Sequence, residues 1–175
     1  MTSSHRRHLL GAALLLPLQA IAQTCGRITP RQTEGPFFTP NSPQRISLLE
    51  GNEKSRLVVT GTVLSAQCKP VPNALLDFWH SDEEGAYDNR GFRYRGHQFA
   101  DAQGRYRLET IVPAEYPGRT RHIHVKVQAP GRRILTTQLY FPGDPGNSRD
   151  FLYRPELEMR APRAGEGMFD FVVDA

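Results

Sequence analysis

The sequence of 175 residues has no apolar run long enough to span a membrane as a helix. The apolar stretch near its N-terminus, Leu9–Ile21, covers about 13 residues, whereas a transmembrane helix needs about 20. We therefore expect no stable membrane anchor. The chain also lacks long basic runs, and its formal net charge is only +4. Nucleic-acid binding is therefore not expected.

The first 22 residues have the features of a signal peptide. Arg6 and Arg7 precede the apolar stretch, and the small residues Ala20 and Ala22 stand where signal peptidase reads them. We expect cleavage after Ala22 and export to the periplasm or beyond. The paired arginine favours the twin-arginine route, with the general secretory route as the alternative. Removal of this segment takes away two arginines and no acidic residue, so the net charge falls from +4 to +2.

Cysteine is scarce, because only Cys25 and Cys68 are present. Two cysteines are too few for a cysteine-rich metal site. In an oxidising compartment we expect them to form a disulfide, with two unpaired thiols as the alternative. Such a bond closes a loop of roughly 44 residues and is worth about 4 kcal/mol in the chain-entropy model.

The rest of the chain shows no internal repeat, low-complexity tract or interdomain linker, which indicates one domain at residues 23–175. Short segments rich in β-branched and aromatic residues alternate with turns that contain Gly and Pro. This pattern predicts an all-β fold, a β-sandwich. The charged stretch Asp82–Ala100 is expected to be an irregular functional loop. The expected strands are Arg56–Leu64, Ala74–His80, Gly104–Val112, His122–Gln128, Ile134–Phe141 and Met168–Asp174.

The strand His122–Gln128 carries two histidines two residues apart. Side chains alternate between the faces of a strand, so His122 and His124 point the same way while Ile123 and Val125 point the other way. Two imidazoles on one face form half of a metal site. The pair alone also fits the solvated polar face of an amphipathic strand, which Lys126 would continue.

The context of the pair favours the metal site. Tyr116 lies six residues before His122 in a Pro-Gly turn, and Tyr87 follows Trp79 in the irregular loop. In this order and spacing, these residues resemble the intradiol ring-cleavage dioxygenases, the family of protocatechuate 3,4-dioxygenase and catechol 1,2-dioxygenase. The resemblance spans essentially the whole chain after the signal peptide. Supporting matches are Thr33–Phe38, Arg95-Gly96, Asp101–Tyr106, Thr110-Ile111 and Leu135–Phe141.

The resemblance implies a non-heme Fe(III) ion held by Tyr87, Tyr116, His122 and His124. The chemistry of these ligands is consistent with that ion, because Fe(III) prefers anionic oxygen and lowers the pKa of a bound phenol. Two tyrosinates and one hydroxide cancel its three positive charges. The implied reaction is cleavage of a catechol-type ring by O2 between its hydroxyl-bearing carbons, giving a cis,cis-muconate-type diacid.

The resemblance also implies roles for residues around the iron. Tyr116 corresponds to the ligand that dissociates and accepts a substrate proton. Arg119 corresponds to an arginine that stabilises negative charge on the substrate, and Gln138 to a residue that helps position the reacting group.

A second set of residues is expected to bind the aromatic substrate. The resemblance places Thr33, Gly35, Pro36 and Phe37 along the pocket, with Phe37 where some relatives carry tyrosine. In some relatives the equivalent segment lines a neighbouring subunit's pocket, so a homo-oligomer is also expected. Which catechol is the substrate does not follow from the sequence.

Two other functions remain as alternatives. One is a periplasmic β-sandwich that binds ligands without chemistry. The other is a zinc or Fe(II) enzyme built on the histidine pair, which would need a carboxylate ligand. The triplet His80-Ser81-Asp82 resembles the His and Asp ligands that some Fe(II) enzymes use with a distant histidine. We interpret this triplet as a chance match.

Overall fold

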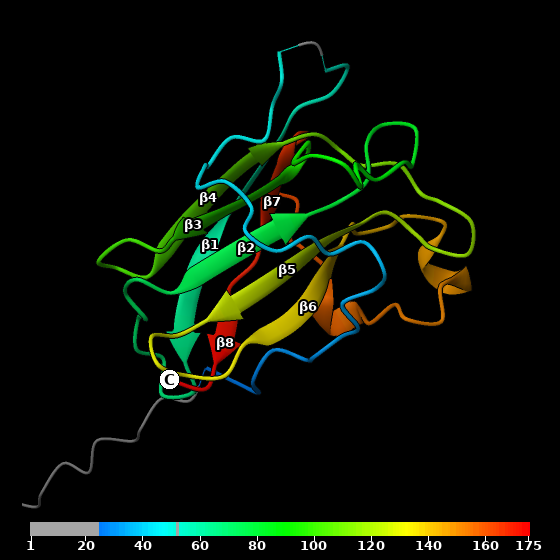
Figure 1. Ribbon diagram of the computed structural model, residues 1–175. Helices are drawn as coiled ribbons and strands as arrows, with labels where there is room; N and C mark the ends of the chain where they lie inside the picture. The colour runs from blue at the N-terminus through cyan, green and yellow to red at the C-terminus, as the bar shows by residue number, and fades with distance from the viewer. Residues whose placement is uncertain (1–24, 52) are drawn as a thin grey trace, which may run out of the picture.

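The computed structural model describes residues 25–51 and 53–175. The expected signal peptide, residues 1–22 with its cleavage site after Ala22, lies outside the described residues. Within them, eight strands form two sheets that pack face to face, so the predicted β-sandwich is confirmed (Figure 1). The part of the chain described here contains no helix with the length and apolar character of a membrane span.

The first sheet has the order β3-β2-β5-β6, and its neighbouring strands are antiparallel. In the second sheet, β4 pairs with β1, and β7 and β8 pair parallel to successive parts of β1. The elements are β1 (Leu57–Ser65), β2 (Leu75–Trp79), β3 (Arg95–Phe99), β4 (Arg105–Thr110), β5 (His122–Gln128), β6 (Leu135–Tyr140), η1 (Asn147–Arg149), η2 (Pro155–Leu157), β7 (Glu166–Met168) and β8 (Phe171–Val173).

The core lies between the two sheets, and the alternation of side chains along β5 decides what faces it. Ile123, Val125 and Val127 are fully buried in the core. His122 and His124 therefore lie on the opposite, outer face of the same strand. Both are nevertheless buried, because loops and the N-terminal segment cover this face.

One row of residues crosses that outer face. Trp79 on β2 lies opposite Arg95 on β3 and opposite His124 on β5, and His124 lies opposite Gln138 on β6. Directly opposed residues in antiparallel strands project from the same face. All four are almost completely buried. The loops that follow β2, precede β5 and follow β6 gather at the end of the sandwich away from the C-terminus (Figure 1).

The prediction that Asp82–Ala100 is irregular throughout was wrong at its end, because Arg95–Phe99 forms β3. No residue of this strand is β-branched and Phe99 alone is a strand-favouring aromatic residue, so composition gave little strand signal. Pairing with β2 along its whole length makes it a strand despite its composition. Gly96 is required by close packing, since a Cβ there would lie 2.7 Å from Leu48 Cδ2.

The C-terminal strand prediction, Met168–Asp174, corresponds to two short strands with a break at Phe169-Asp170. At the break, Phe169 N donates to Thr60 O at 3.0 Å and Asp170 Oδ1 accepts from Thr62 N at 2.8 Å. The Phe169 carbonyl lies where a Cβ on Gly61 would be, 1.7 Å from the position of that atom. Glycine at position 61 therefore permits the break.

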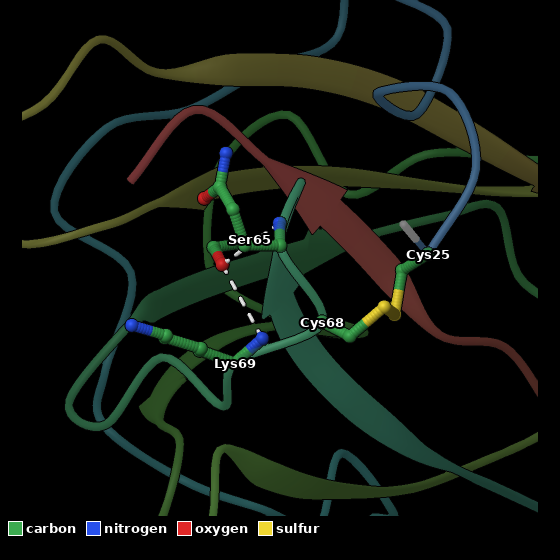
Figure 2. The surroundings of a disulfide bond; sticks show 5 residues. Cys25, Ser65, Cys68 and Lys69 are labelled. Atoms are coloured by element: carbon green, nitrogen blue, oxygen red, sulfur yellow. Dashed lines mark hydrogen bonds between the residues drawn. A yellow bond between two sulfur atoms is a disulfide. The ribbon is translucent and has the colours of Figure 1, made fainter. Parts of the chain in front are cut away.

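A disulfide joins Cys25 to Cys68 in the turn after β1 (Figure 2). The two residues are 43 positions apart in the sequence. Cys68 N donates to Ser65 O at 3.0 Å, which closes the turn. Beyond the bond, Thr29 N donates to Val172 O on β8 at 2.9 Å. The disulfide thus ties the N-terminal segment to the turn after β1, and the Thr29 hydrogen bond holds the segment on β8, at the far end from the gathered loops.

Replacing Cys25 and Cys68 by serine should lower the free energy of unfolding by about 4 kcal/mol, because the unfolded chain regains the entropy of the open loop. Denaturant unfolding of the oxidised protein and the double variant measures this. A reducing agent should destabilise the wild type and leave the double variant unchanged. Equal unfolding midpoints for the oxidised and reduced wild type would contradict the prediction.

Candidate metal centre and active site

Four aromatic side chains meet on the outer face of the first sheet. His122 and His124 come from β5, Tyr87 from the loop between β2 and β3 (residues 80–94, the Tyr87 loop), and Tyr116 from the turn before β5. Ring centroids are 5.7 Å apart for Tyr87–Tyr116, 5.6 Å for Tyr116–His122, 4.7 Å for His122–His124 and 6.3 Å for Tyr87–His124. The structure therefore brings the four expected ligands together in a closed ring.

The two histidines present their Nε2 atoms to each other at 3.1 Å. His122 Nδ1 lies 2.6 Å from the carbonyl oxygen of Thr120, which can only accept a hydrogen bond, so Nδ1 carries the proton and Nε2 a lone pair. Burial, and then the charge of Arg119, lower the pKa of His122 to about 4. Burial, and then His122, hold the pKa of His124 well below its ordinary value. Both rings are therefore neutral at neutral pH, the form that binds metals.

The Tyr87 hydroxyl is buried and makes no hydrogen bond of ordinary geometry. Burial, and then the neighbouring Tyr116, raise the pKa of Tyr87 far above its usual value. Burying a phenol O–H group without a hydrogen-bond acceptor costs free energy. A bound metal ion would remove this cost, because it would replace the proton and stabilise the phenolate. Both tyrosines also border open pockets, Tyr87 one of about 340 Å³ and Tyr116 one of about 360 Å³. The Tyr116 hydroxyl differs from that of Tyr87 in having a hydrogen-bond partner, Arg119.

These donors fit one metal ion. Two nitrogens bound at about 2.1 Å to the same ion, roughly at a right angle, would be about 3 Å apart, as the two Nε2 atoms are. Among the residues described, no group of three or more His, Cys, Asp or Glu side chains could hold a metal. The rings of Tyr87 and Tyr116 lie next to this histidine pair, so their oxygens are the candidate remaining ligands of a metal bound here.

Arg119 is held beside this ring by a buried carboxylate. Its Nε donates to Asp150 Oδ2 at 3.0 Å, and the two side chains are 10% and 0% exposed. Burial lowers the pKa of Arg119, but the hydrogen bond and charge of Asp150 outweigh that effect and raise it. Nη2 donates to Gln138 Oε1 at 2.5 Å, and Nη1 lies 3.4 Å from the Tyr116 hydroxyl. Arg119 thus lies between Tyr116 and Gln138, beside the four converging rings.

The expected substrate-binding residues belong to residues 33–38, which we call the pocket segment. The Thr33 carbonyl accepts a hydrogen bond from Gln138 Nε2 at 3.0 Å. A Cβ on Gly35, whose φ is +70°, would lie 3.5 Å from His124 Cε1, so the backbone passes close to that ring. Phe37 stacks on Tyr87 with ring centroids 4.3 Å apart. Pro36, between them, is exposed.

His80 lies outside the ring and has partners of its own. Its Nδ1 lies 2.7 Å from the Ser81 carbonyl and its Nε2 lies 2.6 Å from Thr110 Oγ1. The imidazole also stacks on Tyr94 and is fully buried. Burial lowers its pKa to about 4. Both nitrogens are used within the fold, so His80 is a structural residue.

The sequence did not point to Asp150, Tyr140 or Gln32. Asp150 lies in a turn-rich segment where no periodic pattern exists. Tyr140 could have been found, because it follows Gln138 by two residues on one strand and therefore shares its face. Its hydroxyl lies 3.0 Å from Gln138 Oε1 and 2.8 Å from Gln32 Oε1. These residues link the pocket segment to Arg119.

The chain is similar to known ring-cleaving dioxygenases. A family model described as Dioxygenase matches residues 33–162. Catechol 1,2-dioxygenase of Acinetobacter baylyi is 32% identical over 155 residues, which cover 71% of this chain and 50% of the relative. Hydroxyquinol 1,2-dioxygenase of Rhodococcus opacus is 32% identical over 136 residues, which cover 63% and 45%. The chain spans about half the length of these curated relatives.

Two solved structures share the fold. The dioxygenase domain of a dioxygenase and carbohydrate-binding fusion protein from Streptomyces sp. SirexAA-E is 56% identical, with a TM-score of 0.82. The match covers 85% of this chain and 99% of that domain. Hydroxyquinol 1,2-dioxygenase from Pseudomonas putida is 26% identical with a TM-score of 0.77, and the match covers 86% of this chain and 68% of that one.

The matched range begins at the pocket segment and includes the Tyr87 loop, the Tyr116 turn, β5 and Asp150. It contains all four candidate ligands and every described residue that binds Arg119 through its side chain. By the family model, the relatives and the shared fold, this chain belongs to the intradiol ring-cleavage dioxygenases.

Proposed function

We propose that this protein cleaves a catechol-type aromatic ring between its two hydroxyl-bearing carbons, using O2 and a bound non-heme Fe(III) ion. The product is a cis,cis-muconate-type diacid. The observation that carries the proposal is the convergence of Tyr87, Tyr116, His122 and His124 on one buried spot. Intradiol dioxygenases generally depend on Fe(III), which supports the choice of metal.

The four converging side chains would hold the ion, with two neutral nitrogens and two phenolate oxygens. The chemistry that Fe(III) supplies when bound is Lewis acidity, which withdraws electron density from a catecholate and prepares its ring for O2. The chain's own residues hold the substrate, move its protons and stabilise its charge.

The two tyrosines differ in their surroundings, which supports different roles. The Tyr87 hydroxyl is shielded from solvent and fixed beneath Phe37. The Tyr116 hydroxyl instead has the charged Arg119 Nη1 3.4 Å from its oxygen. We assign Tyr116 as the residue that would accept a substrate proton and make room for the substrate, and Tyr87 as the residue that would keep holding the ion.

Arg119 supplies a permanent positive charge next to Tyr116. Asp150 binds Nε, so the two Nη groups point toward Tyr116 and Gln138. A guanidinium held in this way is preorganised to stabilise negative charge that develops on substrate oxygen. Gln138 lies opposite His124 and binds both Arg119 and the pocket segment, which supports its positioning role.

Colour distinguishes the proposal from its two alternatives. Tyrosinate bound to Fe(III) gives a red-brown protein, whereas a zinc or Fe(II) enzyme or a binding protein without metal would be nearly colourless. Oxygen uptake with a panel of substituted catechols tests the reaction and identifies the substrate. A colourless protein that consumes no O2 with any catechol, after incubation with iron, would overturn the proposal.

We also propose that the chain is exported and cleaved after Ala22. The Cys25–Cys68 disulfide supports an oxidising compartment. Mass spectrometry of protein from the periplasm or medium should show Gln23 as the first residue, and an uncleaved cytoplasmic chain would contradict export. The homo-oligomer stays a prediction that sedimentation can test.

Replacing Tyr87 by Phe should remove most of the visible absorption and weaken iron binding, because one anionic ligand is lost. Iron content and the visible spectrum measure the effect. Tyr106→Phe is the matched control, since its hydroxyl is buried on the other sheet and donates to Phe169 O. A Tyr87→Phe protein with wild-type colour and activity would exclude Tyr87 as a ligand.

Replacing Arg119 by Ala should slow turnover by about 10²–10³ at equal iron content, because the stabilising charge acts mainly in the transition state. The variant also leaves Asp150 buried without its partner, so stability should fall by about 3–5 kcal/mol. Arg119→Lys should recover little turnover, since it lacks the fork geometry.

Turnover of these variants is measured well below their unfolding temperatures. The control is Arg121→Ala, because Arg121 pairs with Asp144 but is 47% exposed. Near-normal turnover of folded Arg119→Ala would show that the guanidinium has no catalytic role.

A further inference from the structure

Arg95 is a buried cation that the proposed mechanism does not use. It lies on β3 and is 1% exposed. Among the described residues, no carboxylate lies within ion-pair distance of its guanidinium. Burying such a group is unfavourable unless it is hydrogen-bonded, and an apolar side chain would fill the same volume at a lower cost. Its hydrogen bonds therefore indicate why a charge is placed here.

Two of its nitrogens bind two separate segments of the chain. Nε donates to the carbonyl oxygen of Asp88 at 2.9 Å, and Nη1 donates to the carbonyl oxygen of Phe37 at 2.5 Å. Asp88 follows Tyr87 directly in the Tyr87 loop, and Phe37 belongs to the pocket segment. Hydrogen bonds from an ionised donor are about twice as strong as neutral ones, and the planar fork fixes their relative direction.

The same two segments also meet through their side chains. Phe37 and Tyr87 stack with centroids 4.3 Å apart and ring planes inclined by 16°. The backbone bridge through Arg95 and the ring stack thus form two links between the segments. Two links fix both the distance and the relative tilt of the segments, which a single contact would leave free.

The remaining contacts of the pocket segment reach other parts of the site. Lys126 Nζ binds Glu34 Oε2 at 2.5 Å, and Gln138 Nε2 donates to Thr33 O. These contacts hold the first half of the segment against β5 and β6. Lys126 Nζ also lies over the Phe38 ring, 3.3 Å from its centroid. Among the described residues, Arg95 is the side chain whose hydrogen bonds join the second half of the segment to the Tyr87 loop.

We propose that Arg95 is a positioning residue that clamps the pocket segment to the Tyr87 loop, so that the candidate ligand Tyr87 and the pocket wall at Phe37 move as one unit. The assignment of Tyr87 as a ligand rests on the proposed function. The clamp itself rests only on the contacts of the described chain, so the two can be tested separately.

Hydrogen exchange of the metal-free protein tests the clamp. Arg95→Met keeps the size of the side chain and removes both hydrogen bonds, so amides in residues 33–38 and 84–91 should exchange about tenfold faster. Both segments should change together, while β5 amides keep their wild-type rates and report that the fold is intact. Unchanged exchange in either segment would overturn the clamp.

Two further variants make this result specific. Arg95→Lys keeps the charge without the fork and should loosen both segments nearly as much. It replaces Arg95→Met as the test if that variant does not fold. Arg93→Met is the control, because Arg93 lies in the same loop but is 45% exposed and pairs with Asp82. Its exchange should match the wild type.

The spectrum of iron-loaded protein tests the link to Tyr87. In Arg95→Met the visible band should shift in wavelength, because the phenolate changes orientation, and in Arg93→Met it should not. An unshifted band in an Arg95→Met protein whose segments exchange faster would overturn the positioning of Tyr87. A wild type that neither colours with iron nor cleaves a catechol would overturn the proposed function, while the exchange comparison would still decide on the clamp.

Discussion

The register of β5 is the constraint on which the rest of the site depends. Packing of Ile123, Val125 and Val127 into the core forces His122 and His124 to the outer face together. A slip of one residue would exchange the two sets and bury the histidines between the sheets. The same register places Trp79 and Gln138 on either side of His124. The packing of β5 against the core therefore also fixes which residues of β2 and β6 lie beside the histidines.

The two buried arginines beside this row of residues, Arg119 and Arg95, are stabilised in different ways. Asp150 neutralises Arg119 directly and also accepts the Thr120 N–H at 3.0 Å, so the cation and the turn before β5 share one anchor. Arg95 has no such counter-ion: its Nε and Nη1 donate to backbone carbonyls, and its buried Nη2 has no hydrogen-bond partner among the described residues. Both arrangements use a polar side chain to fix a loop that carries a candidate ligand, Tyr116 before β5 and Tyr87 after β2.

The sequence predicted the fold well where composition and periodicity agreed. The expected strand at 122–128 coincides with β5, and the strands at β1, β2, β4 and β6 are displaced by one or two residues at their ends. β3 was missed because Arg95, Gly96 and His97 have no strand preference of their own, and pairing with β2 decides their conformation.

The candidate site was predictable only in part, for a similar reason. Spacing and resemblance pointed to the four candidate ligands and to Arg119, which the fold brings together. Asp150 could not be found in this way, because it meets Arg119 across 31 positions of sequence, a contact that only the folded chain creates. The partners of Arg95 are backbone carbonyls, which leave no trace in residue identity. Contacts between residues far apart in the sequence, and contacts with backbone atoms, therefore could not be predicted from the sequence.

The C-terminus lies at one end of the sandwich and the loops that bear the site gather at the other (Figure 1). A solid support or a fluorescent label coupled to Ala175 therefore leaves the pocket beside Tyr116 facing solution. Molecules of this protein attached in that way would all present the same face outward, so that diffusion of a small aromatic compound to the pocket would not be blocked by the surface that carries them.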